Sequence, residues 1–473
     1  MAVLSTPGYN LQPSAERVAL STNYITNFDF LNQYLPDTYE KEFERYGNRT
    51  VASFLRMVGA EMPSNSDLIK WAEQGRLHTK YVNVATAAAD GDADAILTVS
   101  DTGVTAVAIR VGQTVMISNG TVSAKAIVIA TGFDAATSAP LAFTVAFYDA
   151  LGQTVGLAGT TLSVFVYGSE FKKGTTGMVG SVEAEDVFFE NKPIILKDKY
   201  AVSGSDMAQI GWVEVTTENG ANGYLWYLKS EHETRLRFDD YLETSMIEAV
   251  PAEAGSGASV FLKDGATGSN GGSEGIFYVV NNRGNVWSGG NPTTLPEWDT
   301  IISRLDKQGS IEENVIFLNR AFGFDVDDML AAQNSYGSPG GTSYGLFDND
   351  KDMALNLGFT GFRRGYDFYK TDWKYLNDPT MRGGMAGTGA VNGLLVPAGS
   401  TSVYDQVLGK NAKRPFLHVR YRASETEDRR YKTWITGSAG GAQTSDLDAM
   451  EVQFLSERAV CTLGANNFFI FKD

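Results

Sequence analysis

Four aspartates near residue 90 have the spacing of a calcium-binding loop. Asp90, Asp92, Asp94 and Asp101 stand at positions one, three, five and twelve of such a loop. Carboxylate oxygens are ligands that Ca²⁺ prefers. Position six, where such a loop needs glycine for a sharp turn, is Ala95, and the flanking residues have strand patterns. The motif leaves two interpretations open, a weak calcium site and a solvated loop.

Histidine and cysteine, the other common metal ligands and catalytic groups, are scarce. The histidines are His78, His232 and His418, and the single cysteine is Cys461. No two histidines have a metal-ligand spacing, and neither HExxH nor CxxC occurs. One cysteine also excludes an intramolecular disulfide and favours synthesis in a reducing compartment. We predict packing or surface roles for these four residues, with no catalytic residue and no cofactor.

Other acidic and glycine-rich segments lack the partners that catalysis requires. The acid pair at residues 327–328 could serve glycoside hydrolysis only if a cleft brought carboxylates together. Asp348, Asp350 and Asp352 repeat the alternate spacing of a calcium loop more weakly. The glycines of residues 383–389 occur without the Lys-Ser/Thr of a phosphate-binding loop. We therefore predict a protein that is not an enzyme.

The composition narrows the class of protein further. The chain has 473 residues and a formal net charge of −17, from 56 acidic and 39 basic residues. A chain this acidic lacks the electrostatic signature of a nucleic-acid binder, which would show a basic face. No basic start followed by an apolar run opens the sequence, which predicts no signal peptide. No window approaches about 18 consecutive apolar residues, which predicts no membrane span.

The elements that would position these residues begin with an arm. Residues 1–35 are polar and turn-rich, and we expect them to lie extended on another surface. Residues 36–79 have apolar side chains at helical spacing, and Leu68, Ile69 and Trp71 follow a Ser-Asn-Ser cap signal. The pattern predicts helix in this second segment.

Residues 80–170 change character. They are rich in Val, Ile, Thr and Ala and poor in charge, and apolar residues alternate between turns such as Asn119-Gly120. The pattern predicts a small all-β module. Strand patterns flank it at Val187–Phe189 and Ile194–Tyr200. A β-module between paired strands is typical of an insertion in a long hairpin.

The longest helix candidate runs from Tyr224 to Val250 and is stopped by Pro251. Charged residues, including Glu243, are expected on its solvent faces. At about 1.5 Å per residue it would span about 40 Å and could act as a structural spine. Its predicted apolar stripe comprises Leu225, Leu228, Leu236, Leu242, Met246 and Val250.

The remaining segments mix both patterns. Pro296–Lys307 predicts an amphipathic helix, Asn314–Leu318 a strand, and Gly275–Val280 a short strand among glycine-rich loops. Residues 446–473 alternate in the manner of half-buried strands, with a turn at Gly464-Ala465-Asn466. Most chain ends fray, so strand patterns here indicate an end tied into a sheet.

These segments and several sequence phrases resemble the major capsid proteins of tailed bacteriophages. The closing "SERAV…GANNFFIF", the helix-plus-strand phrase "LPEWDTIISRLDKQGSIEENVIFLNR" and the segment "LGFTGFRRGYDFYKTDWKYLND" are similar to parts of that family. The resemblance covers about residues 1–80 and 171–473. Residues 80–170 depart from the minimal family, and such an insertion resembles its larger members, the crAss-like phage group among them.

The resemblance implies an α+β fold of the tailed-phage capsid type with the all-β module inserted. The implied parts are an N-terminal arm (1–35), a helical start of the peripheral and E-loop region (36–79), the inserted module (80–170), the E-loop return with the spine helix (171–251), an axial domain (252–445) and C-terminal strands returning to the peripheral domain (446–473).

The same resemblance implies a structural role. The chain would be a subunit of an icosahedral virion shell, assembled in the host bacterial cytoplasm as hexamers and pentamers. The shell would enclose double-stranded DNA without reading its sequence, with portal and decoration proteins as partners and no membrane. Two alternatives remain open, a cell-encoded nanocompartment shell of the same fold and a secreted β-rich carbohydrate-binding protein or hydrolase.

Overall fold

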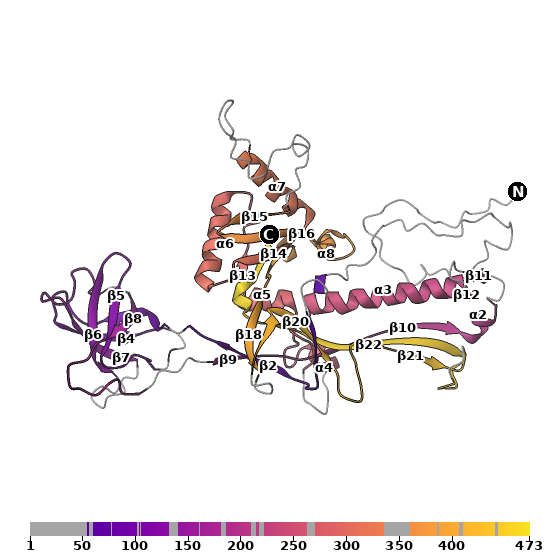
Figure 1. The fold of residues 1–473 in the computed structure, drawn as a ribbon, viewed down its shortest axis with the longest axis horizontal. Coiled ribbons are helices and arrows are strands. Elements are labelled where there is room, and N and C mark those ends of the chain that lie inside the picture. The colour runs from indigo at the N-terminus through magenta and orange to yellow at the C-terminus, as the bar shows by residue number, and fades with distance from the viewer. Residues whose placement is uncertain are drawn as a thin grey trace. The chain divides into compact units, whose positions relative to one another are not determined.

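The computed structural model divides the chain into two compact units, one of mixed α and β structure and one whose described elements are all strands (Figure 1). One unit combines Met1–Lys70 with Glu190–Asp473, and the other is Trp71–Phe189. The predicted arm (1–35) and Asp348, Asp350 and Asp352 lie outside the described residues. The structure describes residues 54–55, 60–76, 78–101, 104, 106–131, 141–159, 161–180, 186–209, 214–216, 222–262, 270–334, 360–385, 387–405, 410–439 and 443–473.

A closed six-stranded barrel forms the unit Trp71–Phe189. Its strands close in the order β3-β4-β7-β6-β5-β8. Inward positions hold small aliphatic side chains such as Val115, Ile117 and Val164, each no more than 1% exposed. The strands are β3 (Lys80–Thr86), β4 (Asp94–Val99), β5 (Gln113–Ser118), β6 (Ser123–Thr131), β7 (Ala142–Phe147) and β8 (Leu162–Ser169).

The helix predicted within residues 36–79 is wrong where that segment is described beyond Phe54 and Leu55. Two strands are present, β1 (Ala60–Ser64) and β2 (Ile69–Gln74). The burial of β2 alternates with period two, so Ile69 and Trp71 share one face of a strand. Ser66 Oγ accepts a hydrogen bond from Leu68 N at 3.3 Å and thereby closes a local turn instead of capping a helix.

A five-stranded sheet is organised around β22 (Ala449–Thr462). Along the path β1-β20-β22-β10, β1 pairs in parallel with β20, and the other neighbours pair antiparallel. The fifth strand, β21, also pairs with β22. The partners are β10 (Ile194–Ser203), β20 (Leu417–Arg422) and β21 (Lys432–Gly437).

The predicted spine helix is confirmed as α3 (Leu225–Glu248), which lies along β10 and β22 (Figure 1). The side chains that it buries differ in part from the predicted stripe. Phe238 packs with Leu242 against Met450, Val452 and Phe454 of β22.

Three residues of this segment differ from the prediction. Leu236 is only half-buried and Val250, beyond the helix, is 58% exposed. Glu243 is 4% exposed instead of solvated, and its Oε1 accepts a hydrogen bond from Phe54 N at 2.7 Å. Phe54 itself stacks on Trp373, with ring centroids 4.6 Å apart. A buried carboxylate therefore anchors an earlier segment of the chain to the helix.

A second, six-stranded sheet has the order β13-β23-β17-β14-β16-β15. The predicted helix at Pro296–Lys307 is confirmed as α6 (Leu295–Gln308), which has a Thr294/Glu297 capping box. Its Trp298 is fully buried, and ring centroids of Phe362, Phe368 and Phe471 lie 4.9–6.1 Å away. The strands are β13 (Asn285–Trp287), β14 (Glu313–Leu318), β15 (Gly361–Arg364), β16 (Tyr366–Asp372), β17 (Val391–Pro397) and β23 (Phe469–Lys472).

The short strand predicted at Gly275–Val280 is wrong, because α5 (Ile276–Arg283) occupies this place. Its buried residues include neighbours in sequence, which strand periodicity alone does not separate from helix. The remaining elements are α2 (Gly204–Gln209), β11 (Glu214–Thr216), β12 (Asn222–Tyr224), α4 (Gly257–Leu262), α7 (Arg320–Asn334), α8 (Lys374–Asn377), β18 (Ser400–Asp405) and β19 (Lys410–Pro415), with 3₁₀ turns η4 (Arg382–Gly384), η5 (Gly387–Gly389) and η6 (Ala465–Asn467).

The strands predicted for residues 446–473 are confirmed, but they divide between the two sheets. β22 belongs to the five-stranded sheet, and β23 lies between β13 and β17 of the six-stranded sheet. Gly464, at φ 60°, starts the turn that separates them. The final segment therefore connects the two sheets instead of returning to one of them.

Candidate functional site

The candidate calcium ligands are engaged with the backbone. Asp90 accepts hydrogen bonds from Gly156 N at 2.8 Å and Ala158 N at 3.1 Å. These bonds lower the pKa of Asp90 below its usual value. Asp92 Oδ2 accepts from Ala89 N at 2.7 Å. Within the described ranges, no group of three or more His, Cys, Asp or Glu side chains could hold a metal ion, and the structure leaves the roles of Asp94 and Asp101 as predictions.

The histidines and the cysteine are dispersed. His78 and His232 are exposed, whereas His418 and Cys461 are buried and face each other as cross-strand partners of β20 and β22. His418 Nδ1 lies 3.3 Å from Pro415 O. Surface roles for His78 and His232 and packing roles for His418 and Cys461 stay predictions.

The acid pair at 327–328 has a structural partner. The Lys370 ammonium forms an ion pair with the Asp327 carboxylate, and both side chains are largely buried. Lys370 also donates to Gly323 O at 3.3 Å. The pair joins β16 to α7 across sequence-distant segments. A salt bridge that is already satisfied in this way favours a structural role for Asp327.

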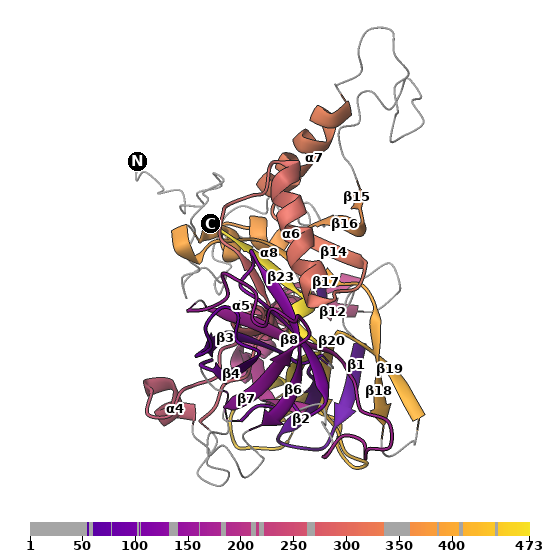
Figure 2. The ribbon, with the colours of Figure 1, turned by 90° about the vertical axis from the view of Figure 1, so that its left-hand side faces the viewer.

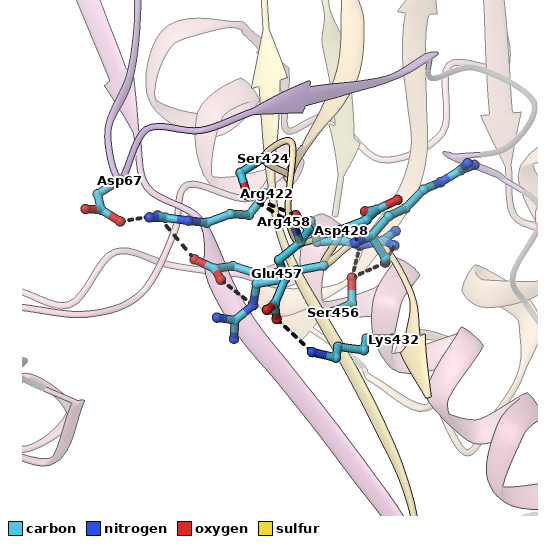
Figure 3. A network of polar contacts seen from close by, with 11 residues as sticks. Asp67, Arg422, Ser424, Asp428, Lys432, Ser456, Glu457 and Arg458 are labelled. Atoms are coloured by element: carbon cyan, nitrogen blue, oxygen red, sulfur yellow. Dashed lines mark hydrogen bonds and ion pairs between the residues drawn. The ribbon is translucent and has the colours of Figure 1, made fainter. Parts of the chain in front are cut away.

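Charged side chains cluster within the five-stranded sheet (Figure 3). Glu457 of β22 has a side chain 8% exposed and lies 3.0 Å from Arg429 and 3.6 Å from Arg422. Arg422 also forms an ion pair with Asp67. This chain of charges links the loop after β1 to β20 and β22, so it ties together strands that are far apart in sequence.

A second branch of the cluster surrounds Arg458. Its Nε donates to Ser456 Oγ at 2.9 Å and its guanidinium donates to Arg430 O at 3.0 Å. Ser456 Oγ donates to the same carbonyl at 2.6 Å. Glu61 of β1 lies 3.5 Å from Arg458 and forms an ion pair with Arg430. Because the Arg458 side chain is only 7% exposed, these partners offset a large desolvation cost.

Sequence reasoning did not find this cluster. The alternation of residues 446–473 predicts a half-buried strand, but β22 is buried on both faces from Phe454 to Thr462. The available signal is that Glu457 and Arg458 stand side by side in an otherwise apolar run, because charges are almost never fully buried unless paired.

Asn191, the last residue of β9 (Asp186–Asn191), is a second buried polar anchor. Its amide donates to Val460 O at 2.7 Å and Glu274 O at 2.9 Å. Its oxygen accepts from Ser273 Oγ at 2.9 Å and Glu274 N at 2.8 Å. One side chain therefore fastens the end of β9 to β22 and to the segment before α5.

Two-stranded ribbons present unpaired strand edges. Among the strands that the structure describes, β18 pairs only with β19 (Figure 2), and β2 pairs only with β9 (Figure 1). On β9, Val187 is 47% exposed and Phe188 is 71% exposed. An isolated pair of strands is marginally stable in water, and an unpaired edge is a template for another strand. These ribbons are the candidate assembly surfaces of the molecule.

The described helices include none that is long and apolar enough to span a membrane.

No protein-family model matches the chain, and no curated protein matches its sequence. A solved structure from Microbacterium phage Oxtober96 is similar at 9% identity and a TM-score of 0.39, over 95% of this chain and 99% of that one. The capsid of an empty GTA particle is similar at 9% identity and a TM-score of 0.37, over 96% and 99%. The capsid of the cyanophage P-SCSP1u is similar at 9% identity and a TM-score of 0.32, over 65% and 80%.

Proposed function

We propose that this chain is the structural subunit of an icosahedral phage capsid. The observation that carries the proposal is the long helix α3 lying along the five-stranded sheet, with a separate six-stranded sheet in the same unit. A spine helix on a peripheral sheet, followed by an axial sheet, is the order that the sequence resemblance to tailed-phage major capsid proteins implies. In this assignment the five-stranded sheet is peripheral and the six-stranded sheet is axial.

The ribbons support an assembling role. β2 with β9 and β18 with β19 each have only two strands among the described elements. The exposed Phe188 side chain would be covered if such a ribbon lay on a second copy of the chain. A closed shell built from one kind of chain needs interfaces of this repeated kind.

The finer parts of the proposal follow from the same fold. The subunits form hexamers and pentamers in the host bacterial cytoplasm, meet portal and decoration proteins, and enclose double-stranded DNA in the virion. The net charge of the chain is −17, and the arginines of the charged cluster face carboxylates. The shell would therefore enclose DNA without binding its phosphates strongly. The role requires no catalytic residue.

Negative-stain microscopy and sedimentation of the purified full chain test the proposal. We expect shells or ring-shaped capsomers. Phe188→Asp places a charge on the exposed face of the ribbon, so it should reduce assembly while leaving the fold intact. Leu151→Asp, at a barrel residue 81% exposed, is the matched control and should leave assembly unchanged.

Monomers in every condition would overturn the capsid proposal. If Phe188→Asp still forms normal shells, the ribbon of β2 and β9 is not an assembly surface, but the capsid proposal stands. Circular dichroism of both variants separates lost assembly from lost folding.

A further inference from the structure

An open hollow of about 450 Å³ lies on the outer surface of the barrel. Its size is within the range of about 300–1,000 Å³ that small-molecule sites occupy. All of its lining residues belong to the unit Trp71–Phe189. They are Thr114, Lys125, Tyr148, Tyr167, Gly168, Ser169 and Glu170.

Two tyrosines provide flat apolar surface at the hollow. Tyr148, just after β7, is 50% exposed, and Tyr167, on β8, is 47% exposed. Tyr148 N donates to Lys125 O at 3.2 Å, which places that ring beside β6. Exposed tyrosines combine a large rigid apolar face with a polar hydroxyl, and such rings contribute strongly to binding.

Tyr167 lies on the outer face of β8 by the alternation of that strand, next to a β-bulge. In the pairing of β5 with β8, Thr114 lies opposite Gly168 and Val115 opposite Val166, so Tyr167 is the extra residue. A Cβ at Gly168 would lie 3.2 Å from Thr114 Oγ1, so the glycine keeps the space above Thr114 open.

The charges at the hollow are balanced. The Lys125 ammonium lies 5.7 Å from the centre of the Tyr167 ring, and Tyr148 donates its hydroxyl proton to Glu170 Oε2 at 2.6 Å. Partial burial and the Glu170 carboxylate raise the pKa of Tyr148 to about 12. One cation and one anion line the hollow, which favours neither charge in a ligand.

We propose that this hollow binds a sugar residue of a neutral saccharide. The apolar C–H faces of a pyranose ring match the faces of Tyr148 and Tyr167. Its hydroxyls act as both donors and acceptors, as do the hydroxyls of Thr114 and Ser169, while Glu170 accepts and Lys125 donates. The proposal concerns the barrel alone and is independent of the capsid proposal.

Isothermal titration calorimetry of the full chain with maltohexaose, cellohexaose and chitohexaose tests the site. We expect at least one of these probes to bind with a millimolar or tighter dissociation constant. Tyr167→Ala and Tyr148→Ala should each weaken that binding about tenfold, because each removes one stacking face. Tyr148→Phe keeps the ring and should weaken binding less.

Tyr369→Ala is the matched control, because Tyr369 is 53% exposed on β16 of the other unit. It should leave binding unchanged. If a tyrosine variant unfolds the barrel, Ser169→Trp at the exposed rim fills the hollow instead and should abolish binding. Failure of all three probes to bind, or binding that survives the tyrosine variants and Ser169→Trp, overturns the proposal.

Discussion

The barrel and the five-stranded sheet deal with strand edges in opposite ways. The barrel takes its six strands from one continuous segment, Lys80–Ser169, and closes them on one another. The five-stranded sheet takes its strands from separate segments and leaves β1, β10 and β21 each with one partner among the described strands. Closure removes edges, whereas open edges must be covered or protected. The barrel is thus self-contained, while the sheets are suited to further contacts.

The barrel and the two sheets also differ in the side chains that they bury. Aliphatic side chains such as Val115 and Val164 dominate the barrel core. The six-stranded sheet buries aromatic rings around Trp298, and the five-stranded sheet adds the paired charges around Glu457. Hydrogen exchange measured by mass spectrometry reports each region separately in the intact chain, and so it tests the comparison.

Trp298→Ala should have the largest effect. Removal of a fully buried indole leaves a cavity in the aromatic core and should cost about 3–5 kcal/mol of stability. Amides of the six-stranded sheet should exchange faster, while barrel amides should keep their protection. Trp434→Ala, at a half-buried position of β21, is the control and should cost less. Equal loss of protection in the barrel would show that the two regions are coupled.

Glu457→Ala should have the second-largest effect on stability. It removes the buried partner of Arg422 and Arg429, whose side chains are 30% and 29% exposed, so the loss should lie between the about 3–5 kcal/mol of a fully buried pair and the about 0–1 kcal/mol of an exposed one. Urea unfolding should show the loss. Glu427→Ala breaks the exposed pair with Lys432 and should cost about 0–1 kcal/mol. Similar losses from both variants would mean that burial of Glu457 contributes nothing.

Leu242→Ala should cost about 2–5 kcal/mol, because Leu242 is 6% exposed and packs α3 on the sheet. Leu236→Ala on the same helix should cost less, because Leu236 is half-buried. The midpoints of urea unfolding for the two variants give the comparison. A larger effect at Leu236 would contradict the observed face of the helix.

Ile117→Val in the barrel should cost about 0.5–1.5 kcal/mol, because Ile117 is 1% exposed. The loss should appear in barrel amides and leave both sheets unaffected. Ile96→Val removes the same methylene from a side chain 48% exposed and should have almost no effect.

Asp90→Asn should have the smallest effect, confined to acid. The pKa of Asp90 is lowered on folding, so its stabilisation is present above the unfolded value of 3.8 and is lost as pH falls through the folded value. In the wild-type chain, hydrogen-exchange protection of the barrel amides should decrease as pH falls below about 4, and this decrease should be smaller in Asp90→Asn. Asp94→Asn, at the exposed first residue of β4, should keep the decline. An unchanged decline in Asp90→Asn would exclude this carboxylate as its source.

Helices and strands could be predicted from sequence where their local signals agree with the way the element packs. Pro251 limits the spine helix, and apolar residues at helical spacing mark α6, so both helices were found from sequence. Ile69 and Trp71 were assigned to helix because they follow a Ser-Asn-Ser cap signal, but Ser66 closes a local turn and the two residues lie on a strand. Glu243 was placed in solvent because its partner, Phe54 N, lies 189 residues away.

The charged cluster and the hollow were not predictable for a related reason. Glu457 meets Arg422 and Arg429 only after β20 and β22 have paired. Tyr148 and Tyr167 approach Lys125 only after the barrel has closed. Sequence patterns report the exposure of a residue along its own element, whereas these sites depend on register between elements.

The dispersed origin of the five-stranded sheet has a consequence for synthesis on the ribosome. β1 pairs with β20, and β10 with β22, which begins at Ala449. At about 5–20 residues per second, β22 emerges tens of seconds after Ser169 has completed the barrel strands. The barrel can therefore fold early, while β1 and β10 wait with unsatisfied edges, and nascent chains would be most prone to aggregate during that interval.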